Sequence, residues 1–468
     1  MAYDKIVDSG SLDSGLTSIA NAIRTKGGTS ASLAFPTGFV NAIGAIPTGG
    51  GGAVEEKDVN FIDYDGTILH SYTKAEITAM TSESDLPSNP SHTGLTAQGW
   101  NWTLAQIKAQ LTAAGGVVNV GQMYTTSSGS TEIDVVMQDG RLSPTLTIAV
   151  KGTVTVDWGD NTTADTVTGN SLTSRKAASH TYASAGEYTI KITIGNSTSE
   201  FSFYCTSSYV ILRKATSLGP SKVYLNCIRE IRLGPGITTI ADYAFYYCTS
   251  LKYITIPKGI TSVGNSSFLY CDLLEAVVLP DTLTYIGGSF SYDRALSRVS
   301  IPSTVTHIGN SAFTTCYVLN DVTIPVSATL GQSAFSSCYK FKHIITSAAS
   351  TLGNSAFSSC ETAPSITILH GVTSIGTSSF ASCPAAITIT IPSSVTSIGS
   401  KAFQYCYGAK EYHVKPTSPP TLASDSLNGI ESDCIIYVPY SSDHSVLNTY
   451  KGASQWSNYA SQIQEEPQ

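Results

Sequence analysis

The feature that most constrains the fold is a phenylalanine that recurs every 22 or 23 residues through the C-terminal half of the chain. It occupies eight positions: Phe245, Phe268, Phe290, Phe313, Phe335, Phe357, Phe380 and Phe403. A fixed period of this length is typical of proteins built from stacked structural repeats. One such unit cannot bury its own apolar face, so neighbouring units must stack and share a continuous core.

A second position repeats in register with the phenylalanine. Three residues after it the chain carries cysteine, except in one unit, where Asp293 takes the place. The cysteines are Cys248, Cys271, Cys316, Cys338, Cys360, Cys383 and Cys406. Because one slot recurs in unit after unit, we expect free thiols packed in the core rather than disulfide bonds. Asp293 in that slot would need a hydrogen-bond partner or an exposed rotamer.

The rest of the unit predicts its local structure. An alternating stretch such as Leu251-x-x-Ile254-x-Ile256 predicts a short strand with one buried face, and Pro257 ends it. The Ser-Ala-Phe piece is expected to be a short helical return. The whole pattern resembles the BspA-like, or Treponema-type, leucine-rich repeat over about 228–440. The resemblance implies a solenoid, which we place at 208–440, and a closing helical cap at 441–468.

The N-terminal half predicts three smaller parts. Residues 1–50 resemble the N-terminal segment of tail proteins from phages of Gram-positive gut Firmicutes, which implies a helical docking or oligomerisation segment. Residues 51–116 predict a small α+β module with a hairpin at Asp65-Gly66 and a helix near 103–113. Residues 117–207 carry Val156-Asp-Trp-Gly-Asp160 and resemble a PKD-like, immunoglobulin-like β-sandwich, a domain that acts as a spacer. The predicted fold class is therefore mainly β and multidomain.

Composition argues against several partners. Charged residues make up only 13% of the chain and the net charge is −8, with no Lys/Arg cluster, so we expect no nucleic-acid binding. No stretch approaches the roughly 20 apolar residues of a membrane span, so no membrane insertion is expected. The N-terminus lacks the pattern of a secretory signal, which favours release by host lysis as part of a virion assembled in the cytoplasm.

Motifs for chemistry are weak. Asp63-Tyr-Asp65-Gly-Thr67 matches the nucleophile motif of haloacid-dehalogenase phosphatases, but the module is too short for that fold, which favours a hairpin turn. Asp157, Asp160 and Asp165 offer oxygen ligands for Ca²⁺ without the Asp-x-Asp-x-Asp-Gly spacing. We expect no enzyme activity, no metal and no cofactor.

Two surfaces of the solenoid are candidate ligand sites. The first is an edge rich in tyrosine, because aromatic rings suit sugar stacking and protein hot spots. Its residues are Tyr247, Tyr270, Tyr292, Tyr317, Tyr339, Tyr405 and Tyr407. The second is the outward face of the predicted strands, with Tyr253, Arg298, Asp321, His343, Glu411 and His413 as its ligand-binding candidates. That face also carries Glu230, Arg232, Thr255, Val278, Ser300, Thr323, Ile345, Thr367, Thr388 and Thr390.

Together these features predict a structural and receptor-binding protein of a phage tail tip or fibre. Its solenoid would recognise a host bacterial surface glycan or protein, and residues 1–50 would dock to other virion proteins. We expect a homo-oligomer. Two alternatives stay open, a bacterial cell-surface adhesin and a virion-associated glycan hydrolase.

Overall fold

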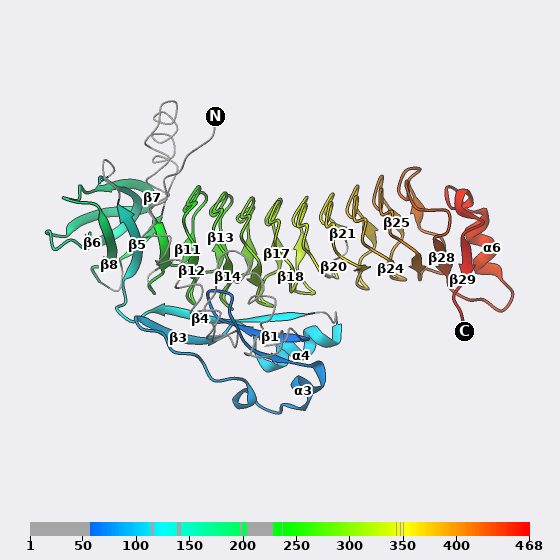
Figure 1. The fold of residues 1–468 in the computed structure, drawn as a ribbon, viewed down its shortest axis with the longest axis horizontal. Coiled ribbons are helices and arrows are strands. Elements are labelled where there is room, and N and C mark those ends of the chain that lie inside the picture. Colours follow the sequence, from blue (N-terminus) through cyan, green and yellow to red (C-terminus); the bar gives the residue numbers. More distant parts are fainter. Residues whose placement is uncertain are drawn as a thin grey trace, which may run out of the picture. The chain divides into compact units, whose positions relative to one another are not determined.

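The fold is described from a computed structural model, shown as a ribbon in Figure 1. It describes residues 57–468, apart from 114–116, 138–141, 197–198, 204–227 and the single positions 236, 343, 347 and 350. All of these residues belong to one compact unit, Glu56–Gln468. The predicted docking segment, 1–50, and the start of the predicted solenoid therefore lie outside the described residues.

The C-terminal part is the predicted solenoid, whose turns stack side by side in Figure 1. Each turn gives one short strand to a first parallel ladder, and in-register pairs such as Ile231 with Ile254 follow the repeat. Its strands pair in two sheets. The first sheet holds β10 (Ile228–Arg232), β12 (Tyr253–Thr255), β14 (Ala276–Val278), β16 (Arg298–Ser300) and β18 (Asp321–Val322). The second holds β20 (Ile344–Ile345), β22 (Ser365–Thr367), β24 (Thr388–Ile391), β26 (Glu411–Val414), β28 (Ile435–Val438) and β29 (Ile463–Glu465).

A second parallel ladder of nine strands runs along the solenoid. It is built from two-residue strands in which an exposed or half-buried polar residue precedes a buried aliphatic one. These strands are β11 (Thr239–Ile240), β13 (Ser262–Val263), β15 (Tyr285–Ile286), β17 (His307–Ile308), β19 (Thr329–Leu330), β21 (Thr351–Leu352), β23 (Ser374–Ile375), β25 (Ser397–Ile398) and β27 (Thr421–Leu422).

The repeated phenylalanines form one column inside the solenoid. Phe313 is fully buried, and its ring stacks 5.3 Å from Phe290 and 5.2 Å from Phe335. The cysteines are free, as predicted, and each described thiol from Cys271 to Cys406 donates to a phenylalanine carbonyl of the preceding turn. Burial raises the pKa of the Cys406 thiol to about 12, so this thiol stays protonated and unreactive near neutral pH.

The predicted helical return is wrong. The segment around each phenylalanine is a run of turns in which alternate N–H groups donate to the next turn of the solenoid. The Phe245 N–H donates to Ser267 O at 2.7 Å, and the Tyr247 N–H donates to Leu269 O at 2.9 Å. Tyr247 and Tyr270 adopt left-handed backbone angles, with φ of 63° and 65°. This conformation, which few residues other than glycine adopt, turns alternate N–H groups along the stacking axis.

Residues 131–203 form an antiparallel β-domain. Its strands are β5 (Thr131–Met137), β6 (Thr145–Asp157), β7 (Asp165–Ser179), β8 (Gly186–Ile194) and β9 (Glu200–Phe203). Strand β5 pairs antiparallel with β10, so this domain and the first solenoid turns belong to one ten-stranded sheet. The two parts also share one hydrophobic core. The domain is therefore built into the end of the solenoid, which corrects the expectation of a separate spacer.

The N-terminal module is a four-stranded sheet in the order β2-β1-β4-β3 with helices beside it. Its elements are β1 (Val59–Ile62), β2 (Ile68–Tyr72), α3 (Lys74–Ala79), η1 (Glu83–Asp85), β3 (Leu95–Trp100), α4 (Leu104–Ala113) and β4 (Val118–Thr126). The predicted hairpin at Asp65-Gly66 and the helix near 103–113 are both present. Because β4 pairs with β1 and β3, the module extends to Thr126, beyond the boundary drawn at 116.

The last solenoid turn is closed as the sequence predicts. Helix α6 (Ser445–Gly452) and the 3₁₀ turn η4 (Trp456–Tyr459) precede β29, which adds to β28. The side chains of Tyr450 and Trp456 are buried and donate to Pro416 O and Pro420 O, each at 2.8 Å. A covered end protects the apolar residues of the terminal turn from water.

Candidate ligand-binding surface

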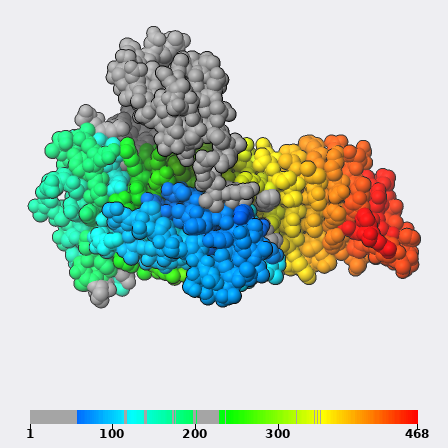
Figure 2. Space-filling model, turned by 60° about the horizontal axis from the view of Figure 1, so that its bottom comes forward, coloured from blue at the N-terminus to red at the C-terminus, as the bar shows by residue number. Residues whose placement is uncertain are grey.

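The outward strand face is covered in the first solenoid turns by the N-terminal module. Strand β4 crosses this face, where the Asn119 N–H donates to Thr323 Oγ1 at 2.8 Å and Ser300 Oγ donates to Asn119 O at 2.6 Å. In Figure 2 the module, in blue, lies over the green turns, whereas the orange and red turns are bare. Small outward side chains allow β4 this close approach.

Side chains from the β3–α4 connection fasten the module to the solenoid. Asn101 Nδ2 donates to Leu279 O and to Ser300 Oγ, each at 2.8 Å, and Trp102 Nε1 donates to Ile301 O at 3.1 Å. The side chains of Asn101 and Trp102 are buried. The hydrogen bonds that they donate therefore replace those that the solenoid acceptors would otherwise make with water.

The part of the candidate strand face that the first turns contribute is therefore covered by the module. Four of the outward residues, Thr255, Val278, Ser300 and Thr323, have at most 4% of their surface exposed. Two predicted ligand-binding residues contact the module instead. Arg298 donates to Gly66 O at 3.3 Å, and the Tyr253 ring lies 6.2 Å from the Tyr64 ring. Burial, followed by the carboxylate of Glu230, raises the pKa of Tyr64 to about 12.

We expect a single methyl group to disturb this docking. A Cβ at Gly121 would lie 2.4 Å from Val278 Cγ1 and 3.0 Å from Ser300 Cβ. Gly121→Ala should therefore destabilise the docked module by about 1–3 kcal/mol, seen as faster hydrogen exchange in β14 and β16. The matched control is Gly452→Ala, since nothing lies within 4 Å of a Cβ there. Equal exchange in the two variants would refute the docking.

The bare part of the strand face holds Glu411 and His413, but these side chains bond to neighbours. His413 Nδ1 lies 2.8 Å from Glu466 Oε1, and His413 Nε2 lies 3.3 Å from Glu411 Oε2. The His413 ring also stacks on Tyr437 at 5.2 Å. Of the other predicted residues of this face, His343 and the side chain of Asp321 lie outside the described residues.

The tyrosine edge is divided into three groups. Tyr247, Tyr270 and Tyr292 form a stack with ring centroids 4.5 and 4.9 Å apart. Tyr317 stacks on Tyr339 at 4.8 Å, with 7° between the ring planes. Tyr405 and Tyr407 form a separate pair at 5.5 Å. The structure thus brings together neighbours that share a slot of the repeat, as well as Tyr405 and Tyr407 of a single turn, and does not gather all seven rings into one site.

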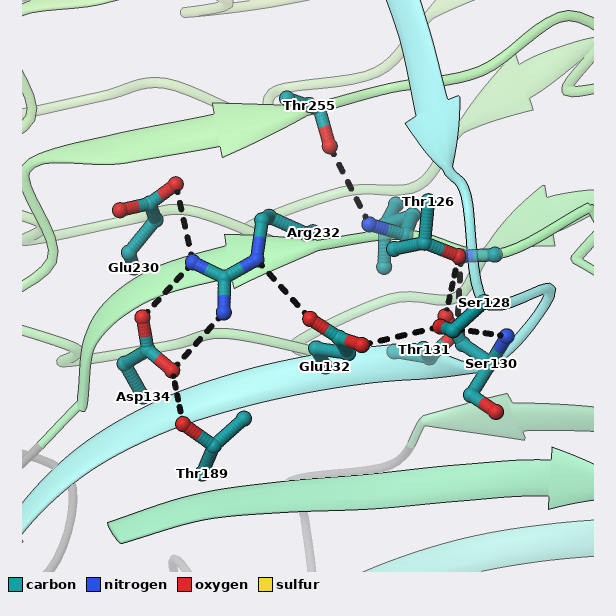
Figure 3. Close-up of polar contacts among 12 residues, drawn as sticks. Thr126, Ser128, Ser130, Thr131, Glu132, Asp134, Thr189, Glu230, Arg232 and Thr255 are labelled. Atoms are coloured by element: carbon teal, nitrogen blue, oxygen red, sulfur yellow. Dashed lines mark hydrogen bonds and ion pairs between the residues drawn. The ribbon is translucent and has the colours of Figure 1, made fainter. Parts of the chain in front are cut away.

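The junction between the β-domain and the solenoid holds a charged hub, drawn in Figure 3. Arg232 makes two hydrogen bonds to Asp134, at 2.7 and 2.9 Å, and one to Glu132 at 3.2 Å. Glu230 Oε1 lies 3.2 Å from Arg232 Nη1. A hollow of about 370 Å³ lies beside the hub. Because one guanidinium of β10 binds carboxylates of β5, we assign the hub to joining the two parts.

Removal of this guanidinium should loosen the junction. Arg232→Ala leaves three partly buried carboxylates without their shared cation, so we expect a loss of about 2 kcal/mol in unfolding free energy, with faster hydrogen exchange in β5 and β10. The matched control is Arg229→Ala, which removes a pair to Glu187 whose side chains are 58% and 74% exposed. Exposed pairs contribute little, so similar losses in both variants would show that burial of the hub is unimportant.

The acidic residues that resembled a phosphatase motif or Ca²⁺ ligands in the sequence instead bind neighbouring groups of the fold. Asp157 accepts from the Gly159 N–H at 2.9 Å, Asp160 Oδ2 lies 2.7 Å from His180 Nε2, and Asp165 accepts from Trp158 Nε1 at 2.9 Å. Asp63 Oδ1 accepts from the Tyr64 N–H, and its Oδ2 lies 2.7 Å from His92. Within the described ranges, no group of three or more His, Cys, Asp or Glu side chains is placed to hold a metal ion.

Residues 193–293 and 288–410 match the BspA type leucine rich repeat region, in six copies. The matched part of the solenoid is thus similar to BspA-type leucine-rich repeats. The structure continues the first ladder beyond the matched residues, through β26, β28 and β29. A search of curated proteins gives no match. Among the helices of the described part, none is long and apolar enough to cross a membrane.

Solved leucine-rich-repeat proteins are similar to this chain. One from Bacteroides ovatus is 21% identical, with a TM-score of 0.35, over 45% of this chain and 66% of that one. One from T. pallidum is 25% identical, with a TM-score of 0.24, over 27% and 64%. A leucine rich cell surface protein from Faecalibacterium prausnitzii is 20% identical, with a TM-score of 0.23, over 49% and 84%. The chain thus spans slightly less than two thirds of the first two proteins.

Sequence reasoning missed the residues that dock the module onto the BspA-type repeats. Asn101, Trp102 and Gln110 reach carbonyl or hydroxyl groups of the solenoid, and Gln110 Nε2 donates to Ile324 O at 3.0 Å. The repeat gave no signal of this docking, since small polar residues fill outward slots both beneath the module, as at Thr255 and Ser300, and away from it, as at Thr388 and Thr390.

Proposed function

We propose that this chain is a non-enzymatic recognition protein that binds a macromolecule of a bacterial surface with the tyrosine-bearing edge of its solenoid. The observation that carries this proposal is the exposure of large apolar side chains in the turns of that edge. The exposed fractions are 39% for Tyr243, 45% for Leu273, 38% for Val318, 43% for Tyr405 and 49% for Tyr407. Exposed apolar side chains that lie close together mark interaction sites, and Tyr405 and Tyr407 form such a pair.

The rest of the fold suits this role as a rigid base. The β-domain shares a sheet with the solenoid, and the module covers one face of the solenoid, so the tyrosine edge is held in one geometry. A preformed surface binds with a smaller loss of conformational entropy than a flexible one. In this proposal residues 1–50 attach the protein, as a homo-oligomer, to a phage tail tip or fibre.

The first test measures binding of the labelled full-length protein to intact Gram-positive cells. The full chain is required because the β-domain and the solenoid share one core. The double variant Leu273→Lys, Val318→Lys should lose binding through desolvation of the new charges. The control is Thr239→Lys, Thr351→Lys, which alters exposed residues of the second ladder. Absence of binding to every strain, or equal losses in both double variants, would refute the proposal.

A second measurement tests whether the protein is part of a phage particle. Antibodies against the protein should label purified phage particles from lysed cultures. Labelling of the producing cells instead, with particles unlabelled, would replace the virion by a cell-surface adhesin and leave recognition by the solenoid intact. Release of reducing sugars from the bound envelopes would point to the hydrolase alternative.

A further inference from the structure

Most tyrosines of the edge do not offer a ring face to a ligand. Tyr247, Tyr270 and Tyr292 share the slot two residues after the repeated phenylalanine, so their rings stack on one another. Tyr317 and Tyr339 share the slot after the cysteine and also stack. All five side chains are only half-exposed. In these stacks a ring of the neighbouring turn covers at least one face of each tyrosine.

Tyr405 and Tyr407 differ because the neighbouring turns carry no ring in the same slots. The slot of Tyr405 holds Ser382 in the turn before and Gly429 in the turn after, and the slot of Tyr407 holds Pro384 in the turn before. A Cβ at Gly429 would lie 3.3 Å from Tyr405 Cδ1 and 3.1 Å from Tyr407 Cε1. The Gly429 backbone therefore lies against the pair on one side, and on the other side the slot of Tyr405 holds only the small side chain of Ser382.

We propose that Tyr405 and Tyr407 form the platform on which a pyranose ring of a surface glycan stacks. This inference rests on the proposed function and names the ligand class and the site. The apolar C–H face of a pyranose packs on an aromatic face, while its hydroxyl groups need hydrogen-bond partners around the rings.

Such partners lie in the same two turns. The Lys410–Asp433 ion pair, at 2.8 Å, is exposed, and the connection after Gly429 adds the exposed polar residues Glu431 and Ser432. A carboxylate in an ion pair keeps lone pairs for sugar hydroxyls. Because Lys410 and Asp433 neutralise each other, the rim suits an uncharged sugar better than a strongly charged one.

The test uses the full-length protein and purified wall polysaccharide from a strain that it binds, measured by titration calorimetry. Tyr405→Ala, Tyr407→Ala should weaken binding at least about tenfold. Tyr405→Phe, Tyr407→Phe keeps both ring faces and should stay within about threefold. The control Tyr317→Ala, Tyr339→Ala removes the same number of rings from a stacked pair and should retain binding.

A further variant blocks the open face without removing a ring. Ser382 has a left-handed φ of 59°, close to the 63° of Tyr247, so the slot accepts tyrosine. In Ser382→Tyr the new ring should stack on Tyr405 as Tyr270 stacks on Tyr292, and glycan binding should be lost at an unchanged melting temperature. Retained binding in this variant and in the double alanine variant would overturn the platform.

Cell binding separates this inference from the proposed function. If labelled protein still bound intact cells after periodate oxidation of their glycans, and bound equally well with both tyrosines replaced by alanine, the platform would be wrong while solenoid recognition stood. A protein receptor would then be the ligand. Loss of cell binding on oxidation, in step with its loss in the double alanine variant, supports the saccharide site.

Discussion

Replacement of Phe313 by alanine is expected to lower the free energy of unfolding by about 3–5 kcal/mol. The ring is fully buried, and it stacks between Phe290 and Phe335 at 5.3 and 5.2 Å. Alanine would leave a cavity in the middle of the column, where neighbouring turns cannot close without breaking their ladders. The measurement is guanidinium-induced unfolding of the full chain, followed by circular dichroism.

The position of this cavity gives the prediction a second readout. A solenoid is stabilised by contacts between adjacent turns, so a weak contact in the middle uncouples the parts on either side. We therefore expect the single transition of the parent protein to broaden or split in two. Tyr285→Ala is the control, because this ring also stacks in the column direction, on His307 at 5.2 Å, but is 36% exposed. Equal losses in the two variants would mean that the buried column does not hold the turns together.

The solenoid could be predicted because its information is local and repeated. Each unit shows the alternation of a one-sided strand, and eight phenylalanines fix the register of the stack. The return segment was mispredicted because Ser-Ala-Phe has ordinary helical propensity, whereas the neighbouring turn supplies hydrogen bonds that hold residues such as Tyr247 at positive φ. Tertiary hydrogen bonds outweighed the local preference there.

The partly covered strand face could not be predicted from the repeat. The contact between Asn101 and Ser300 joins residues 199 positions apart, and no periodicity links the module to the solenoid. An outward serine in a ladder has the same pattern whether water or another strand covers it. The division of the tyrosine edge, by contrast, can be predicted from the sequence, because Tyr270 and Tyr292 share one slot of the unit and Tyr317 and Tyr339 share another.

Asp293 is expected to make the stability of the protein depend on pH. It fills the cysteine slot and is fully buried, with Oδ1 accepting from the Cys271 N–H at 2.8 Å. Among the described residues its Oδ2 has no hydrogen-bond partner. Burial raises the pKa of the Asp293 carboxyl well above its usual value, although the Cys271 N–H acts in the opposite direction. The folded protein therefore holds a proton on this group.

The sign of the effect follows from proton counting. Above the ordinary aspartate pKa of about 3.9, the unfolded chain has released this proton while the folded protein still binds it. The free energy of unfolding then falls as the pH rises, by about 1.4 kcal/mol per pH unit until the raised pKa is reached. Asp293→Asn keeps an oxygen acceptor for the Cys271 N–H and has no such dependence. The two proteins should match near pH 4 and diverge as the pH rises from there toward the raised pKa of Asp293.

At neutral pH, Asp293→Cys should raise the free energy of unfolding more than Asp293→Asn does, since it introduces the cysteine that the other turns carry at this position. A thiol there would donate to Phe268 O, as Cys316 donates to Phe290 O at 3.1 Å. The control is Asp433→Asn, because the hydrogen bond from Lys410 lowers the pKa of Asp433 and its contribution appears as the pH rises. The measurement is the melting temperature of the parent protein and of each variant across this pH range. A gap between the parent protein and the Asp293→Asn variant that stayed constant with pH would show that this carboxyl is ionised or solvated within the fold.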